Sequence, residues 1–294
     1  MAASTTQEEW ATRQERGTLP LIRLAVWIVL RVGRRAGHLL LLPACAYFFL
    51  FSRQSRVASL AYLARVLGRP PTTVDRWRHY RCFATCLLDR VLLLNGRVDL
   101  FDVTLHGEAG IAAIRAEGGG CFLFGAHVGS FEVVRAVGRH MADVRVSLVM
   151  YEENARKSNA VLHAINPELA MQIIGLGKPG SMLAVRDRLD DGHLVGLLAD
   201  RSLENERRME IPFLGTPARF PVGPFRMAAM LGRPVVLMLG LHRGGPRYDI
   251  VFETITARPS DEPIEDTMRR YVARLEYYCR SAPYNWFNFY DFWA

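Results

Sequence analysis

From about residue 98 onward, short runs of β-branched or apolar side chains alternate with longer segments whose apolar positions follow helical spacing. The runs predict strands near Val103–His106, Cys121–Gly125, Val144–Met150, Met171–Ile174, Leu194–Leu198, Val235–Gly240 and Tyr248–Thr254. The longer segments predict helices near Ala109–Ala116, Phe131–Met141, Arg156–Ala164, Ser181–Asp190, Gly223–Leu231 and Pro263–Arg280. Strands that alternate with helices in this way form sheets covered on both faces. The expected fold is therefore α/β, with a mixed, mostly parallel sheet flanked by helices.

The first part of the chain has a different pattern. Residues 1–19 are polar, which predicts a disordered tail, and two apolar runs follow at Leu21–Leu30 and Leu39–Phe51. Neither run reaches the roughly 20 apolar residues of a single membrane span. We expect residues 20–52 to form a helical membrane anchor, either a tilted span or a helix at the interface. A buried helical hairpin is the alternative. Residues 53–294 are expected to form one domain that begins with helices at Arg53–Leu67 and Thr73–Leu94.

Composition narrows the classes of partner. Hydrophobic residues make up 50% of the chain and charged residues 22%, which excludes a long disordered region. The net charge of +8 suits an anionic membrane surface or an acidic carrier protein, and we expect no nucleic-acid partner. The five cysteines include no Cys-x-x-Cys pair, which argues against a disulfide framework or a zinc ribbon and favours buried free thiols.

A catalytic constellation is expected where the predicted strand Cys121–Gly125 ends. A loop then presents His127, and a helix begins near Ser130, which places Glu132 in its first turn. Ligands of open α/β sheets bind at the carboxyl ends of strands. A neutral imidazole there can take the proton of an attacking hydroxyl, while a carboxylate fixes its tautomer. We therefore expect His127 to be a general base with Glu132 as its partner. A metal site lacks a third ligand nearby, and a serine nucleophile lacks the Gly-x-Ser-x-Gly motif.

A second block supports a specific family. The run Gly192–Arg201 reads Gly-His-Leu-Val-Gly-Leu-Leu-Ala-Asp-Arg, and the run Ile211–Arg219 reads Ile-Pro-Phe-Leu-Gly-Thr-Pro-Ala-Arg. Together with the His-x4-Glu box at Gly125–Glu132, these blocks resemble the lipid A late acyltransferases, the lauroyl and myristoyl transferases of lipopolysaccharide assembly. The two blocks occur in the family's order, and with the apolar N-terminus the likeness covers nearly the whole chain.

The resemblance implies an acyltransferase that needs no cofactor. It would move an acyl group from acyl carrier protein or acyl-CoA to a hydroxyl of a lipid acceptor, at the cytoplasmic face of the bacterial inner membrane. Residues 53–294 would then be the acyltransferase domain. The catalytic residues would be His127 and Glu132. The residues expected to bind substrate are Gly129, Arg156, Asp200, Arg201 and Arg219, of which the last is a candidate for holding a phosphate.

The sequence departs from the lipid A enzymes in two places. Acidic residues come first in the segment Tyr151–Arg156, where an arginine is usual, and the ending Ala282–Trp293 replaces a Pro-x-Gln-Trp-x-Trp-like close. This ending is similar to relatives in aryl polyene or xanthomonadin-type pigment pathways, so lipid A, a pigment lipid and another glycolipid all stay open as acceptor. Its aromatic side chains are expected to line an acyl tunnel, to lie at the membrane interface or to pack on the sheet. A hydrolase using the same base and a non-catalytic membrane adaptor for acyl carrier protein are the alternative functions.

Overall fold

The structure, a computed structural model, describes residues 19–133, 145–151, 165, 173–177, 180–202 and 206–293. Nearly all of the predicted tail, the predicted helix Arg156–Ala164 and most of the predicted helix Phe131–Met141 lie outside these residues.

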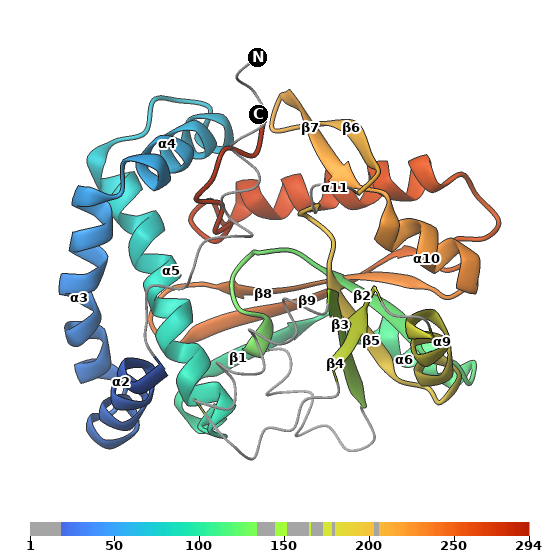
Figure 1. The fold of residues 1–294 in the computed structure, drawn as a ribbon, viewed down its shortest axis with the longest axis horizontal. Coiled ribbons are helices and arrows are strands. Elements are labelled where there is room, and N and C mark those ends of the chain that lie inside the picture. Colours follow the sequence, from blue (N-terminus) through green and yellow to red (C-terminus); the bar gives the residue numbers. More distant parts are fainter. Residues whose placement is uncertain are drawn as a thin grey trace.

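The core of the molecule is a sheet with the strand order β1-β9-β8-β2-β5-β3-β4 (Figure 1). The strands are β1 (Asp102–His106), β2 (Cys121–Gly125), β3 (Val146–Tyr151), β4 (Ile173–Leu176), β5 (Leu194–Leu198), β8 (Val235–His242) and β9 (Arg247–Thr256). Neighbouring strands pair in parallel, except that β8 and β9 form an antiparallel hairpin. The expected α/β fold with a mixed, mostly parallel sheet is confirmed.

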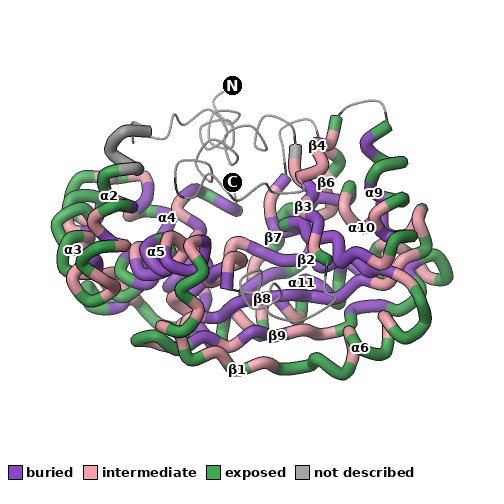
Figure 2. The backbone as a smooth tube through the Cα atoms, turned by 90° about the horizontal axis from the view of Figure 1, so that it is seen from below, coloured by how far each residue is buried: buried purple, intermediate pink, exposed green. Residues whose placement is uncertain are grey.

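Strand β2 lies at the centre of this sheet, between β5 and β8. Its sequence, Cys-Phe-Leu-Phe-Gly, contains no polar residue, and every one of its residues is buried. A strand that is apolar on both faces requires cover on both faces. Figure 2 shows β2 and β8 as buried segments inside an exposed outer layer.

Helices pack around the sheet. They are α6 (Glu108–Ala116), α9 (Ser181–Asp190), α10 (Gly223–Leu231) and α11 (Ile264–Ser281). Helix α9 contacts β4 and β5, and α11 contacts β9 and α10. The bounds of α9 and α10 coincide with those expected from the apolar spacing.

A two-stranded hairpin of β6 (Arg208–Phe213) and β7 (Thr216–Pro221) was not expected from the sequence. The prolines of this segment indicated a turn, yet Pro212 and Pro217 lie opposite each other in the antiparallel ladder. Proline is tolerated here because each strand of a two-stranded ribbon has a free edge, where the missing N–H costs no ladder hydrogen bond. The chain reverses at Leu214 and Gly215, both with positive φ, as hairpin turns require.

The N-terminal part is helical, with α2 (Leu19–Val32), α3 (Arg34–Phe51), α4 (Arg53–Leu67) and α5 (Thr73–Leu94), and a short 3-10 turn follows at Val98–Leu100. Helix α5 begins with a capping box: Asp75 N donates to the Thr72 hydroxyl over 3.1 Å, and Thr72 N donates to the Asp75 carboxylate over 2.8 Å. The bounds of α4 and α5 are those expected from sequence.

A buried ion pair joins the N-terminal helices to the rest of the molecule. Arg34 in α3 donates from Nε and Nη2 to the two oxygens of Asp89 in α5, over 2.7 and 2.8 Å. Asp89 is fully buried and also accepts the Tyr248 hydroxyl of β9 over 2.8 Å. Helices α3 and α5 therefore pack against one another, and the Tyr248 hydroxyl connects α5 to β9.

Among the described helices, none is by itself both long and apolar enough to cross a membrane. Helices α3 and α4 together meet the length and composition of a span, but they are bent by 88° where they join. The membrane anchor at residues 20–52 stays a prediction.

Candidate active site

The register of the sheet brings two polar side chains to the same point. Strands β2 and β5 are parallel neighbours, with Gly125 opposite Leu198. His127 follows the end of β2 by two residues and Asp200 follows the end of β5 by two residues, so both emerge at the carboxyl edge of the sheet. This edge is where ligands of open α/β sheets bind.

His127 and Asp200 are joined by two hydrogen bonds. The Asp200 Oδ1 atom lies 2.8 Å from His127 Nδ1, and Asp200 Oδ2 accepts the backbone N–H of His127 over 3.0 Å. Because an ionised carboxylate only accepts hydrogen bonds, Nδ1 must carry the proton in the neutral ring. The Nε2 atom then has a free lone pair, and the His127 side chain is 30% exposed. This is the tautomer that a general base needs.

The surroundings keep this pair in the required charge states. Burial raises the pKa of Asp200, but the neighbouring His127, the charge of Arg201 and the hydrogen bonds from His127 outweigh burial and hold that pKa well below its usual range. Burial and the charge of Arg201 lower the pKa of His127 from its ordinary value of 6.5, against the opposing pull of Asp200. At neutral pH, Asp200 is therefore ionised and His127 is neutral.

The sequence predicted Glu132 as the carboxylate partner of His127, but Glu132 is not bonded to His127 Nδ1. Its Oε1 atom lies 2.8 Å from Nε of Arg90 in α5, and its Oε2 atom accepts the Ser130 hydroxyl over 3.4 Å. The Glu132 side chain is 17% exposed, in the first turn after the loop that carries His127. Asp200 occupies the position expected for Glu132 because β5 adjoins β2 in the sheet, which the sequence pattern does not reveal.

The loop after β2 is held tightly against β8. Gly129 has φ 64°, and a Cβ at this residue would lie 1.9 Å from the Gly240 carbonyl oxygen, so only glycine fits. Consecutive amides of the loop donate within the protein: His127 N to Asp200, Val128 N to Ala126 O, Gly129 N to Asn285 O and Ser130 N to Gly240 O. The amides of His127, Val128 and Gly129 are therefore occupied and are not available to stabilise an oxyanion.

The other expected substrate-binding residues are placed differently. Arg201 lies next to the His127–Asp200 pair; its Nη2 donates to Phe287 O over 2.7 Å and its guanidinium lies 5.0 Å from the Tyr290 ring centroid. Arg219 is exposed within β7, opposite Glu210. Arg156 lies outside the described residues.

A family model described as bacterial lipid A biosynthesis acyltransferase matches residues 26–294. The chain belongs to this family. It is therefore an acyltransferase, and the family points to acceptors that resemble lipid A. A search of curated proteins finds no match.

Two residues that hold the site of this acyltransferase were not expected from the sequence. Trp286, in the C-terminal aromatic segment at residues 284–293, is fully buried and donates from Nε1 to Asp200 Oδ2 over 3.1 Å. Asn285 accepts the Gly129 amide, and its side chain bonds both the N–H and the carbonyl of His242. The aromatic segment was expected to line an acyl tunnel, to lie at the membrane interface or to pack on the sheet. These contacts show that it packs against the domain. Its aromatic composition drew attention, but nothing in the sequence indicated that one indole would reach Asp200.

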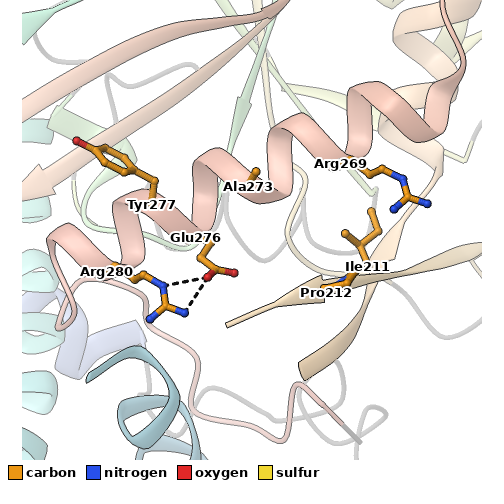
Figure 3. A pocket seen from close by; sticks show the side chains of 7 residues that line it. All are labelled: Ile211, Pro212, Arg269, Ala273, Glu276, Tyr277 and Arg280. Carbon is orange, nitrogen blue, oxygen red and sulfur yellow. Dashed lines mark hydrogen bonds and ion pairs between the residues drawn. The ribbon is translucent and has the colours of Figure 1, made fainter. Parts of the chain in front are cut away.

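A groove lies between α11 and β6 (Figure 3). Its volume is about 480 Å³. Its lining consists of Ile211, Pro212, Arg269, Ala273, Glu276, Tyr277 and Arg280. Arg280 is paired with Glu276, one turn earlier on α11, with Nε and Nη2 donating over 2.9 and 2.8 Å. The groove contains none of the residues that surround His127. Within the described residues, no group of three or more His, Cys, Asp or Glu side chains is arranged to hold a metal ion.

Proposed function

We propose that this acyltransferase moves a fatty acyl group from an acyl thioester, carried by acyl carrier protein or CoA, directly onto a hydroxyl of a glycolipid or similar amphipathic acceptor. His127 is the general base and Asp200 its orienting partner. The observation that carries this proposal is the 2.8 Å contact between His127 Nδ1 and Asp200 Oδ1, which leaves Nε2 unprotonated.

In the proposed reaction, the acceptor hydroxyl attacks the thioester carbonyl carbon while its proton passes to His127 Nε2. The tetrahedral intermediate then collapses: the carbon–sulfur bond breaks, and the leaving thiolate takes the proton back from the imidazolium. The products are an ester and a free thiol, so the enzyme returns unchanged. Asp200 stabilises the transient imidazolium, the usual role of a carboxylate behind a catalytic histidine.

Arg201 is the proposed source of positive charge for the intermediate. The loop amides of residues 127–130 donate to other protein groups, so they are not free to bind an oxyanion. The charge of Arg201 lowers the pKa of His127, which supports a position of the guanidinium close to the imidazole. A fixed charge at the point where negative charge develops is typically the largest electrostatic contribution to catalysis. The Phe287 carbonyl and the Tyr290 ring hold this guanidinium in place.

For Glu132 we propose a structural contribution to activity. By pairing with Arg90 and accepting the Ser130 hydroxyl, it ties the end of the His127 loop to α5. It keeps the loop in position, while Asp200 acts on the imidazole.

Attachment to the cytoplasmic face of the inner membrane also remains a proposal. Large apolar side chains of α2 and α3 are exposed, among them Trp27 at 58%, Leu39 at 68% and Phe51 at 71%. Such a concentration of apolar surface favours an interface with lipid. In sedimentation with anionic vesicles, Leu39→Ser should weaken binding. The control Leu183→Ser, on α9 and 57% exposed, should leave binding unchanged. Equal binding by all three proteins would contradict membrane attachment through α3.

To test this function, the purified protein in detergent micelles is given a radiolabelled acyl group carried as a thioester on CoA or on acyl carrier protein. The reaction is run with and without a lipid A precursor that has a free hydroxyl. The expected product is a labelled ester lipid that forms only when the acceptor is present. Free fatty acid as the sole product would show a hydrolase instead. Thioester binding without turnover, unaffected by His127→Ala, would show an adaptor.

A further inference from the structure

The C-terminal aromatic segment pairs with the loop that carries His127. Val128 and Trp286 form an antiparallel bridge. On one side of it, Phe287 N donates to the His127 carbonyl over 2.8 Å, and on the other, Gly129 N donates to the Asn285 carbonyl over 2.8 Å. The backbone of His127 is therefore fixed by residues more than 150 positions later in the chain.

The side chain of Trp286 reaches the second member of the pair. Its Nε1–H donates to Asp200 Oδ2 over 3.1 Å, and the same oxygen accepts the backbone N–H of His127 over 3.0 Å. With Oδ2 occupied by these two donors, Oδ1 is left to face His127 Nδ1 over 2.8 Å. The indole N–H thus helps to decide which carboxylate oxygen meets the imidazole.

Trp286 is itself held rigidly. It is fully buried, with Tyr62 of α4 and Phe213 of β6 edge-on to its ring at centroid distances of 5.0 and 5.2 Å. Its carbonyl lies 2.9 Å from Nε2 of His79 in α5, and the other nitrogen of that ring lies 2.9 Å from the Ser59 hydroxyl. These contacts leave the indole no alternative position from which to donate.

We propose that Trp286 is a positioning residue of the acyltransferase, acting through Asp200. Its indole N–H holds the carboxylate in the rotamer that keeps His127 Nε2 free to accept a proton. By donating to Asp200, the indole also withdraws electron density from the carboxylate, which then stabilises the imidazolium less. This inference rests on the proposed function of His127 as base.

The chain offers a matched control for removal of this single N–H. Trp293 lies in the same segment, with its ring centroid 6.0 Å from that of Trp286. Its Nε1 is buried and has no hydrogen-bond partner among the residues that the structure describes. Trp286→Phe and Trp293→Phe therefore remove similar aromatic volume, but only the first removes a donor from Asp200.

The experiment measures acyl transfer against pH for the full-length variants. Trp286→Phe should lower kcat about tenfold, as expected for loss of a hydrogen bond to a charged group, with KM within about twofold. Its acid limb should move to higher pH, because Asp200 with one donor fewer favours the imidazolium more strongly. Trp293→Phe should change neither quantity. A wild-type profile for Trp286→Phe, or the same shift in both variants, would overturn the proposal.

A second measurement does not depend on turnover. Titration of the His127 ring nitrogens by ¹⁵N NMR should give a higher pKa in Trp286→Phe than in wild type, and an unchanged pKa in Trp293→Phe. If acyl transfer is absent in every protein while this shift is present, the proposed function fails and the positioning role stands. If Trp286→Phe does not fold, replacing Trp286 with 3-benzothienylalanine, which has the shape of tryptophan without the N–H, gives the same comparison. No shift with that replacement would overturn the role.

Discussion

The carboxylate of Asp200 contacts His127 through both oxygens, Oδ1 at the imidazole Nδ1 over 2.8 Å and Oδ2 at the backbone N–H over 3.0 Å. Side chain and backbone of the histidine are therefore oriented by one buried group. Asp200 is fully buried, and the hydrogen bonds from His127 together with the charge of Arg201 stabilise its ionised form. The pair behaves as a unit whose geometry is set before substrate binds.

Asp200→Asn should reduce kcat by about 10³-fold while the protein stays folded. The backbone N–H of His127 and the indole N–H of Trp286 both donate to Oδ2 of Asp200. The amide oxygen of asparagine will therefore take the place of Oδ2. The amide NH₂ then faces His127 Nδ1 and forces the proton onto Nε2, where it blocks the base. The measurement is the rate of acyl transfer, with circular dichroism as the check on folding. A rate within tenfold of wild type would show that Asp200 does not orient the base.

Glu132→Gln should lower kcat about tenfold, clearly less than Asp200→Asn, because it weakens an ion pair and leaves the imidazole contacts in place. Arg90→Gln should have a similar effect, and the double variant should be little worse than either single one, since both remove the same contact. Kinetics of the three variants test this. If Glu132→Gln alone is as inactive as a variant that lacks His127, Glu132 takes part in the chemistry, as its spacing from His127 had suggested.

The buried imidazole of His79 should lower the free energy of unfolding in acid. Burial lowers the pKa of this imidazole from the ordinary value of 6.5 to about 4, against the opposing effect of the hydrogen bond to Trp286 O. Between these values the unfolded chain binds a proton that the folded protein does not, so the free energy of unfolding falls as pH drops, by about 2 kcal/mol from about pH 7 to pH 5. His79→Gln should lose less over this range in urea titrations. His106→Gln, whose parent side chain is 52% exposed, should follow wild type. Identical pH dependence in all three would contradict the assignment.

Arg34→Ala should destabilise the protein by about 3–5 kcal/mol, because it leaves the charge of Asp89 buried without its main partner. Arg35→Ala, at the next and exposed position of the same helix, should change the free energy of unfolding by less than about 0.5 kcal/mol. Urea denaturation of both variants measures the difference. Equal stability of the two would show that α3 is not fastened to the domain by this ion pair.

Much of the fold was predictable because the strands are short and uninterrupted. The apolar run Cys121–Gly125 and the run Leu194–Leu198 gave strand bounds that the structure reproduces. The β6–β7 hairpin was missed because its prolines indicate a turn unless the ribbon is known to have free edges. The apolar N-terminal run was correctly expected to be helical, but its spacing could not show Arg34 reaching Asp89.

In the site, the position of His127 at the end of β2 was predictable, but its partner was not. The spacing of Glu132 made it the nearest carboxylate along the chain. Asp200 is 73 residues away in sequence and reaches the imidazole only because β5 lies beside β2. One signal was present: His127 and Asp200 each follow a buried strand by two residues. The contribution of Trp286 depends on how the C-terminal segment returns to the loop, which no local pattern encodes.

The role of His127 is tested most directly by the acyl-transfer rate of His127→Gln under single-turnover conditions, beside wild type and the exposed-site control His106→Gln. Glutamine can still donate to Asp200 but cannot accept the proton of the acceptor hydroxyl. If His127 is the general base, His127→Gln should be folded and about 10²–10⁴-fold slower than wild type, and the control should have the wild-type rate. A wild-type rate of ester formation by His127→Gln would show that His127 is not the base.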